Sequence, residues 1–301
     1  MTKTQPKRHH WWPECVSKHW ADQAGGVHWI LPDGEVRRAK PASFGVIGNG
    51  HFIKMGDGAE QFWRNNNYES EFQKADDAFP RLISWLDDLD RAGPPFERQK
   101  ADRIIRQSAT EAEMALLFGS LVSLAIRSPM HRERSVSQAE YIRGTLPERE
   151  RNILIGANMQ RAQRVLTEKI GGRGKALVIF SPEREFIFGD GFFHNIYPPA
   201  EHIRNLTMLV PLTPWISVLY TTPRAYRVEP RLATMVVNIA EAEDLNSIVQ
   251  IYAKRMLFYR SEPPIVSDAF RRCEHLVYDE GHNPVDTFVE LIPGIYPIET
   301  F

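Results

Sequence analysis

The pattern of apolar and polar positions divides the chain into a helical part and a part with strands. From residue 68 to 170 apolar residues recur every three or four positions, as on one face of a helix. From 175 to 238 they form short runs typical of buried strands, and the period changes at Gly171-Gly172. The pattern predicts an α+β fold in which a helical N-terminal half packs on a mainly antiparallel sheet, with a C-terminal helix.

Residues that start or stop helices set the expected limits inside the helical part. A first amphipathic helix is expected over 68–89, with a bend near Pro80. A second, over 103–127, is apolar nearly all round its middle and is expected in the core. Ser128-Pro129 stops it, and a capping box at Thr145 begins a third helix over 147–170.

Turn residues mark the strands. Pro32-Asp33-Gly34 lies between two short strand-like runs, which predicts a β-hairpin. A Ser-Pro-Glu-Arg turn separates two later runs, and a last helix is expected over 241–259. The remaining expected strands are 176–180, 185–188, 206–212, 216–221 and 235–237.

Length and composition fit one folded unit. The chain has 301 residues, of which 43% are hydrophobic, 25% charged and 11% aromatic, close to ordinary globular usage. It shows no internal repeat and no low-complexity linker. We therefore expect a single α+β domain over residues 1–301, with the helical part at about 68–170 and the sheet part at about 175–238.

Net charge, cysteine spacing and the lack of long apolar runs indicate where in the cell the protein is expected. Lys and Arg together number 37 against 38 Asp and Glu, so net charge gives no argument for a nucleic acid or a membrane. Cys15 and Cys273 lack the spacing of a zinc site or a redox dithiol. No apolar signal-peptide run follows the polar start, and no stretch has the roughly 20 apolar residues that span a bilayer. These features predict a cytoplasmic protein without a membrane partner.

The first candidate site residues are the tandem histidines His9 and His10. Imidazoles ligate metals and move protons near neutral pH, and the neighbouring Trp12 would shield such a site from water and contact substrate. The alternative is that one ring bonds a backbone carbonyl while the other faces solvent.

Asp190 and His194 form a second candidate. Asp190 lies between two glycines at an expected strand end, where a backbone approaches a ligand closely and a carboxylate is well presented. With His194 it would make a metal-binding or acid–base pair. The alternative is an ordinary Asp-Gly turn.

Two further charged residues stand at helix ends. Glu69 would act as a base or contact substrate, although a carboxylate at a helix start also complements the helix dipole. Arg127 closes an apolar helix, where it would either cap the last carbonyls or hold an anionic group.

Basic residues are concentrated between residues 143 and 175. A basic helix face of this kind would meet the phosphates of a nucleic acid, or bind another protein. The alternative is a solvated face balanced by the acidic residues of 76–90. The basic residues are Arg143, Arg149, Arg151, Arg161, Arg164, Lys169, Arg173 and Lys175, against Glu148, Glu150 and Glu168.

Several short motifs, in order, resemble the bacterial family named domain of unknown function 4238. They are His9-His10-Trp11-Trp12-Pro13, Tyr68-Glu69, Arg127-Ser128-Pro129, Phe186-Ile187-Phe188-Gly189-Asp190, Pro211-Leu212-Thr213-Pro214 and Asn238. The chain differs from the family's pattern on both sides of Asp190, where it has Gly189 and Gly191-Phe192. The resemblance implies a bacterial protein and a shared fold, and it implies no activity.

Two functional hypotheses follow. In the first, the chain is a metal-assisted hydrolase of the phosphodiesterase or nuclease type, in which His9, His10 and Asp190 move protons and His10 and Asp190 bind a divalent metal ion. Arg127 would hold the scissile anion. Loss of His10 or Asp190 would then remove function with little change in melting temperature.

In the second hypothesis the chain is a non-catalytic binding or regulatory module, as in a bacterial defence or toxin system, which uses the basic segment or exposed aromatic residues. The sequence contains no phosphate-cradling glycine loop, no Gly-x-Ser-x-Gly and no His-Glu-x-x-His motif, which disfavours nucleotide-driven chemistry.

Overall fold

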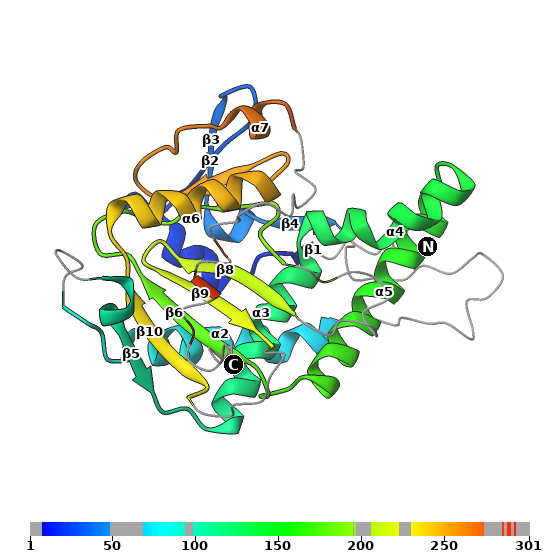
Figure 1. Cartoon of the computed structure of the whole chain (residues 1–301). Helices are drawn as coiled ribbons and strands as arrows, with labels where there is room; N and C mark the ends of the chain where they lie inside the picture. Colours follow the sequence, from blue (N-terminus) through cyan, green and yellow to red (C-terminus); the bar gives the residue numbers. More distant parts are fainter. Residues whose placement is uncertain are drawn as a thin grey trace, which may run out of the picture.

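The chain combines helices with mostly antiparallel sheets in a computed structural model, which confirms the α+β class (Figure 1). The structure describes residues 8–48, 69–93, 99–194, 196, 206–222, 230–273, 285, 288–289 and 292.

The larger sheet has five strands in the order β5-β10-β6-β9-β8. Its pairs are antiparallel except β10 with β6, which run parallel. Every residue of β6 and β9 is buried, so both faces of the sheet are covered. The strands are β5 (Ile104–Gln107), β10 (Leu232–Val236), β6 (Lys175–Phe180), β9 (Ile216–Thr221) and β8 (Thr207–Thr213).

A second sheet joins segments from both ends of the chain. Its order is β3-β2-β11-β7, and all its pairs are antiparallel. β2 and β3 form the hairpin predicted around Pro32-Asp33-Gly34. The strands are β2 (Val27–Ile30), β3 (Val36–Ala39), β11 (Leu257–Tyr259) and β7 (Phe188–Gly189), and a separate pair joins β1 (Arg8–His10) to β4 (Val46–Gly48).

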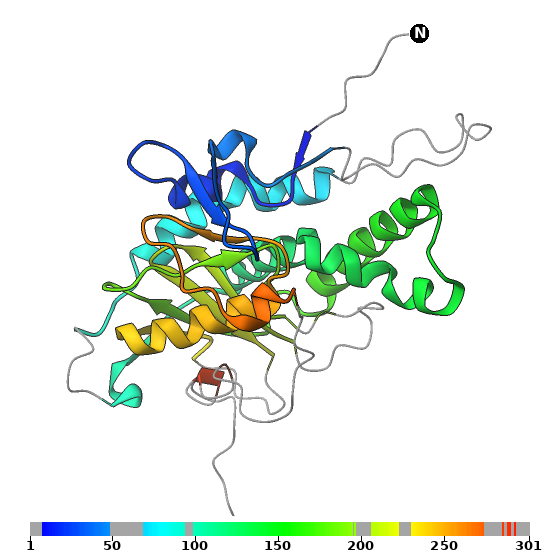
Figure 2. The ribbon, with the colours of Figure 1, turned by 90° about the horizontal axis from the view of Figure 1, so that it is seen from above.

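Helices cover the five-stranded sheet. α6 (Ile239–Tyr252) lies on one face, and α2 (Glu69–Asp87) and α3 (Glu111–Arg127) lie on the other (Figures 1 and 2). α3 is buried over most of its length, as expected for a core helix, and Leu117 is fully buried. The short helices are α1 (Glu14–Ser17) and α7 (Asp268–Arg271), with 3-10 turns at Lys18–Trp20, Pro41–Ser43 and Lys100–Arg103.

A helical hairpin extends away from this body, as both ribbon views show (Figures 1 and 2). It consists of α4 (Pro129–Arg143) and α5 (Glu148–Lys169), and we call it the arm. Ser128-Pro129 ends α3, as predicted, but the same two residues also begin α4. The Ser128 hydroxyl accepts the backbone N–H of His131 at 3.2 Å, and proline suits the first helical position.

Local predictions failed where tertiary pairing decided the structure. Residues 104–107 form strand β5 rather than the start of a helix, because they pair with β10. Of the strand expected over 185–188, only the end is found, as β7 at Phe188–Gly189, which pairs with β11 in the second sheet. α6 ends at Tyr252, and residues 257–259 are a strand. Pro147 is the N-cap of α5 without a side-chain cap, so the predicted Thr145 capping box is absent there.

Among the described residues, no single helix has both the length and the apolar composition needed to cross a membrane. Together, α3 and α4 have this length and apolar composition, but the two helices are bent by 62° at their junction.

Candidate functional site

The segment from Asp190 to His194 connects the two sheets and carries two of the predicted site residues. Its first residue is fixed by two backbone hydrogen bonds: the Asp190 N–H donates to the Met256 carbonyl at 3.1 Å, and the Met130 N–H of α4 donates to the Asp190 carbonyl at 3.2 Å. His194 forms an isolated bridge with Met208 of β8. The segment therefore lies between the base of the arm, the end of α6 and the edge of the larger sheet.

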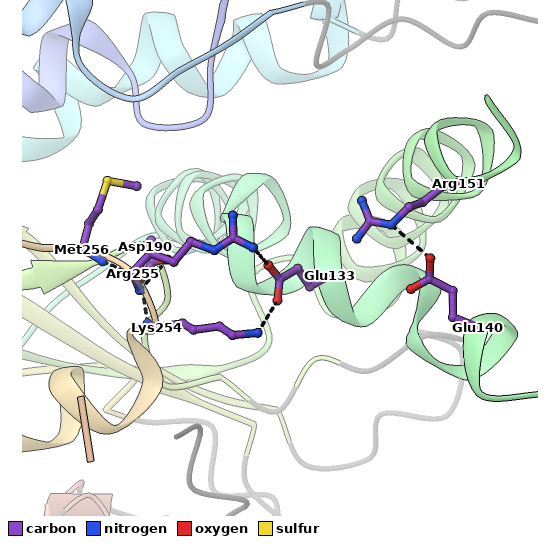
Figure 3. Close-up of polar contacts among 7 residues, drawn as sticks. All are labelled: Glu133, Glu140, Arg151, Asp190, Lys254, Arg255 and Met256. Atoms are coloured by element: carbon purple, nitrogen blue, oxygen red, sulfur yellow. Dashed lines mark hydrogen bonds and ion pairs between the residues drawn. The ribbon is translucent and has the colours of Figure 1, made fainter. Parts of the chain in front are cut away.

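The carboxylate of Asp190 binds the turn at residues 254–256. Backbone N–H groups of Lys254 and Arg255 donate to its two oxygens at 2.9 and 3.1 Å, and the N–H of Met256 lies at 3.5 Å (Figure 3). Burial raises the pKa of this carboxyl group, and the three backbone N–H groups act in the opposite direction. Both oxygens are engaged in the fold, so the earlier expectation that losing Asp190 leaves the melting temperature unchanged is revised.

Glu133 of α4 binds the same turn from the arm. Its carboxylate accepts from Lys254 Nζ at 3.1 Å and from Arg255 Nη2 at 2.6 Å (Figure 3). Further along the arm, Arg151 Nε donates to Glu140 at 3.1 Å and joins α5 to α4. These ion pairs fix α4 against the body and the two helices of the arm against each other.

Gly191 is required by the close approach of α4 and α6. A Cβ atom on it would lie 2.3 Å from the Tyr252 carbonyl oxygen and 2.8 Å from the Met130 side chain. The glycine after Asp190, at which the chain differs from the family's pattern, is thus explained by packing.

Two buried histidines are the most unusual feature of this region. His131 is fully buried and His194 is 2% exposed, and their ring centroids lie 5.7 Å apart with the planes inclined by 55°. Among the described residues, Nδ1 and Nε2 of His131 and Nε2 of His194 have no hydrogen-bond partner, and we call these three the open nitrogens. Most buried polar atoms are hydrogen-bonded, so three open nitrogens in one place require an explanation.

Both imidazoles are neutral at pH 7. Burial, followed by the charges of Arg134 and Arg132, lowers the pKa of His131 to about 3. Burial likewise lowers the pKa of His194 well below its ordinary value, and the nearby His131 and Arg134 act in the same direction. The pair is therefore uncharged, and the positive charges of Arg132 and Arg134 act on it.

Aromatic rings connect this pair to the N-terminal segment. Trp12 is fully buried and stacks on Phe188 at 4.4 Å, and its ring lies 6.3 Å from that of Phe192, which in turn lies 5.8 Å from His194. Trp12 Nε1 is buried and has no hydrogen-bond partner in the described part of the chain. The structure thus brings the Trp12 ring close to Phe192 of the Asp190–His194 segment.

Arg127 lies in a different environment. Its two terminal nitrogens bind the carboxylate of Asp76 at 3.0 and 2.6 Å, its Nε donates to the Ser123 carbonyl, and its side chain is 1% exposed. The guanidinium thus binds a carbonyl of its own helix and an acidic side chain of α2. The anionic partner of Arg127 is a residue of the chain itself, and the guanidinium ties α3 to α2.

Three predicted residues cannot be placed in the site. His9 and His10 belong to strand β1, and Glu69 is the first residue of α2, but their side chains lie outside the described residues. The prediction that His10 meets Asp190 therefore stays a prediction. Within the described residues, no group of three or more His, Cys, Asp or Glu side chains is placed to hold a metal ion.

Some side chains of the basic segment 143–175 already bind other groups of the chain. Arg143 pairs with Glu150, Arg151 pairs with Glu140, and the buried Lys175 donates to the Pro230 carbonyl at 3.0 Å. Arg149, Arg164 and Arg173 are exposed. The segment is therefore less basic at its surface than its sequence suggests.

Comparison of the chain with protein-family models, curated proteins and solved structures finds no significant match. The resemblance to the family named domain of unknown function 4238 therefore stays a prediction.

Proposed function

We propose that the chain is a hydrolase whose acid–base residues are His131 and His194. The observation that supports this proposal is the set of three open nitrogens on two buried imidazoles. Leaving such groups unpaired costs stability, about 1 to 3 kcal/mol for each group, and sites that keep this cost are often sites of function.

The protonation state suits the first half of a hydrolytic step. A neutral imidazole accepts a proton from a water molecule as that water attacks, and the resulting imidazolium then donates a proton to the leaving group. His131 and His194 take the place that the sequence-based hypothesis gave to His9 and His10, and Trp12 and Phe192 supply the apolar wall. The divalent metal ion assigned to His10 and Asp190 remains part of the hypothesis and is tested separately.

The test is hydrolysis of chromogenic esters by the purified chain. A phosphomonoester, a phosphodiester and a carboxylic ester are compared, each with EDTA and with added Mg²⁺, Mn²⁺ or Zn²⁺. His131→Gln and His194→Gln should each lower kcat by about a hundredfold or more, as loss of an acid–base group does. His19→Gln, on an exposed histidine, is the matched control and should leave kcat unchanged. Full activity in both site variants would contradict the proposal.

A second candidate, a binding module, has its own observation. Tyr141 and Ile142 at the tip of the arm are 91% and 71% exposed, which is unusual for large apolar side chains placed side by side. Their replacement by serine should abolish binding of a protein partner and leave ester hydrolysis unchanged. If no ester is hydrolysed and this tip is needed for the protein's cellular effect, the binding module is the better hypothesis.

A further inference from the structure

We propose that the His131–His194 pair binds an oxyanion, the phosphate-type or carboxylate group of a small molecule. This inference rests on the proposed function, because it names the substrate class of the same site. It follows from which ring nitrogens are donors, from the separation of the rings and from the charges around them.

The first step concerns the proton on His194. Its Nδ1 accepts the backbone N–H of Ile196 at 3.3 Å, so Nδ1 carries no proton. In the neutral ring the proton is then on Nε2, which is one of the open nitrogens. His194 therefore presents a buried N–H donor, and a metal ion would need a lone pair at that position.

The second step concerns His131, on which both nitrogens are open. In its neutral form this ring offers one N–H donor and one nitrogen that takes up a proton. An oxygen that accepts a ring N–H lies about 4 Å from the ring centroid. The two centroids are 5.7 Å apart, so a single acceptor group placed beside the pair is within reach of an N–H from each ring. An oxyanion has several acceptor oxygens, and it would supply the partners that the described residues do not.

The third step concerns charge. Arg132 and Arg134, on either side of Glu133 in α4, are the charged side chains that act on His131, and Arg134 also donates to the His194 carbonyl at 3.3 Å. The carboxylates of Glu133 and Asp190 bind other groups, Glu133 the side chains of Lys254 and Arg255, and Asp190 the 254–256 turn. The charges of Arg132 and Arg134 favour an anion and disfavour a metal cation.

Binding of an anion should therefore bring a proton with it. The negative charge opposes the effects of burial and of the arginines, which favours the imidazolium form of His131. Sulfate is a suitable probe, because it does not itself titrate near pH 7. Comparing the binding of inorganic phosphate with that of acetate then shows whether the site prefers a phosphate-type group or a carboxylate.

The experiment is isothermal titration calorimetry of the full chain with sulfate, in two buffers of different ionisation enthalpy. We expect saturable binding with proton uptake at pH 7. His131→Gln should remove the uptake and weaken binding by about tenfold or more, and His194→Gln should weaken it similarly, because each loses a hydrogen bond to a charged group. His19→Gln should bind as the unchanged chain does.

A measurement on the unchanged chain covers the case in which a variant does not fold. Long-range ¹H–¹⁵N spectra of the histidine rings should show two rings shifting with sulfate, one of them to the imidazolium form. Absence of sulfate, phosphate and acetate binding would overturn the inference, as would tight Zn²⁺ binding with proton release that His131→Gln or His194→Gln abolishes. Sulfate binding without ester hydrolysis would support the anion site and contradict the proposed hydrolase activity. Ester hydrolysis that sulfate does not inhibit would support the hydrolase activity and contradict the anion site.

Discussion

At the scale of single residues, the buried histidines make the stability of the protein depend on pH. In the unfolded chain a histidine gains a proton as the pH falls through about 6.5, whereas the folded chain keeps His131 neutral down to about 3. The unfolded state thus binds more protons over this window, so stability is lost as the pH falls from about 6.5 toward 3.

The loss is at most about 1.4 kcal/mol per pH unit for each such histidine. Urea unfolding at pH 7.0 and 5.5 should show a smaller pH effect in His131→Gln than in the unchanged chain, because carboxyl groups contribute equally to both. Equal pH effects in the two proteins would show that folding does not shift the pKa of His131.

Asp190 is the second residue whose contacts predict a measurable effect. Asp190→Asn keeps one acceptor oxygen but places an NH₂ group against backbone N–H donors of the 254–256 turn. We expect it to lower the free energy of unfolding by about 1 to 3 kcal/mol. Asp88→Asn, on an exposed aspartate of the turn that follows α2, is the control and should change it by less than about 0.5 kcal/mol. An unchanged melting temperature in Asp190→Asn would contradict this structural role and would support the prediction from sequence that Asp190 is a site residue.

The sequence singled out Trp12, Asp190 and His194, and the structure places all three along one segment and its packing partner. Their signals were local: aromatic residues beside histidines, and an aspartate between glycines. His131 was missed because a histidine within a helix has no distinctive spacing. Its importance comes from a neighbour 63 positions along the chain, which only the fold brings to it.

At the scale of elements, helix periodicity predicted α2, α3 and α5 because each is long enough to show it. β5 was assigned to a helix, and the strand that contains β7 was placed too early, because strands of this length are decided by their partners rather than by their own sequence. α4 was missed because Ser128-Pro129 was taken only as a stop signal.

The core position of α3 predicts a large effect of truncating Leu117. Leu117 is fully buried, so Leu117→Ala should lower the free energy of unfolding by about 2 to 5 kcal/mol. The adjacent Leu116 is only half-buried, and Leu116→Ala, which removes the same atoms, should cost clearly less. Denaturant unfolding measures both, and similar values would place the two residues in equivalent environments.

A buried ion pair joins the 3-10 turn before β5 to α6 and gives a second prediction at this scale. Arg103 is 2% exposed, and its Nη1 and Nη2 bind the Glu241 carboxylate at 2.7 and 2.6 Å. Glu241→Gln leaves the buried guanidinium without its counter-charge and should cost about 3 to 5 kcal/mol. Asn238→Ala removes only the cap of α6 and should cost about 1 kcal/mol. A cost for Glu241→Gln no larger than for Asn238→Ala would mean that the charge pairing adds no stability.

At the scale of the whole molecule, the sequence predicted the α+β class but not how its parts connect. Strand β2 near the start of the chain pairs with β11, which is more than 200 positions away, and β11 pairs with β7. Pairing over such distances leaves no periodic signal in the sequence. It also makes the N-terminal segment part of the fold rather than an appendage.

This connectivity predicts that the molecule unfolds in one cooperative transition. The Trp20 indole N–H donates to the Leu212 carbonyl of β8 at 3.1 Å, so the N-terminal segment is bound to the larger sheet as well as to the second sheet. Scanning calorimetry should show one heat-absorption peak whose calorimetric and van't Hoff enthalpies agree. Trp20→Phe removes the donor and should move that single peak to lower temperature without dividing it. Two separate peaks in the unchanged chain, or a second peak created by Trp20→Phe, would show that the two sheets unfold independently and that residues 1–301 form more than one domain.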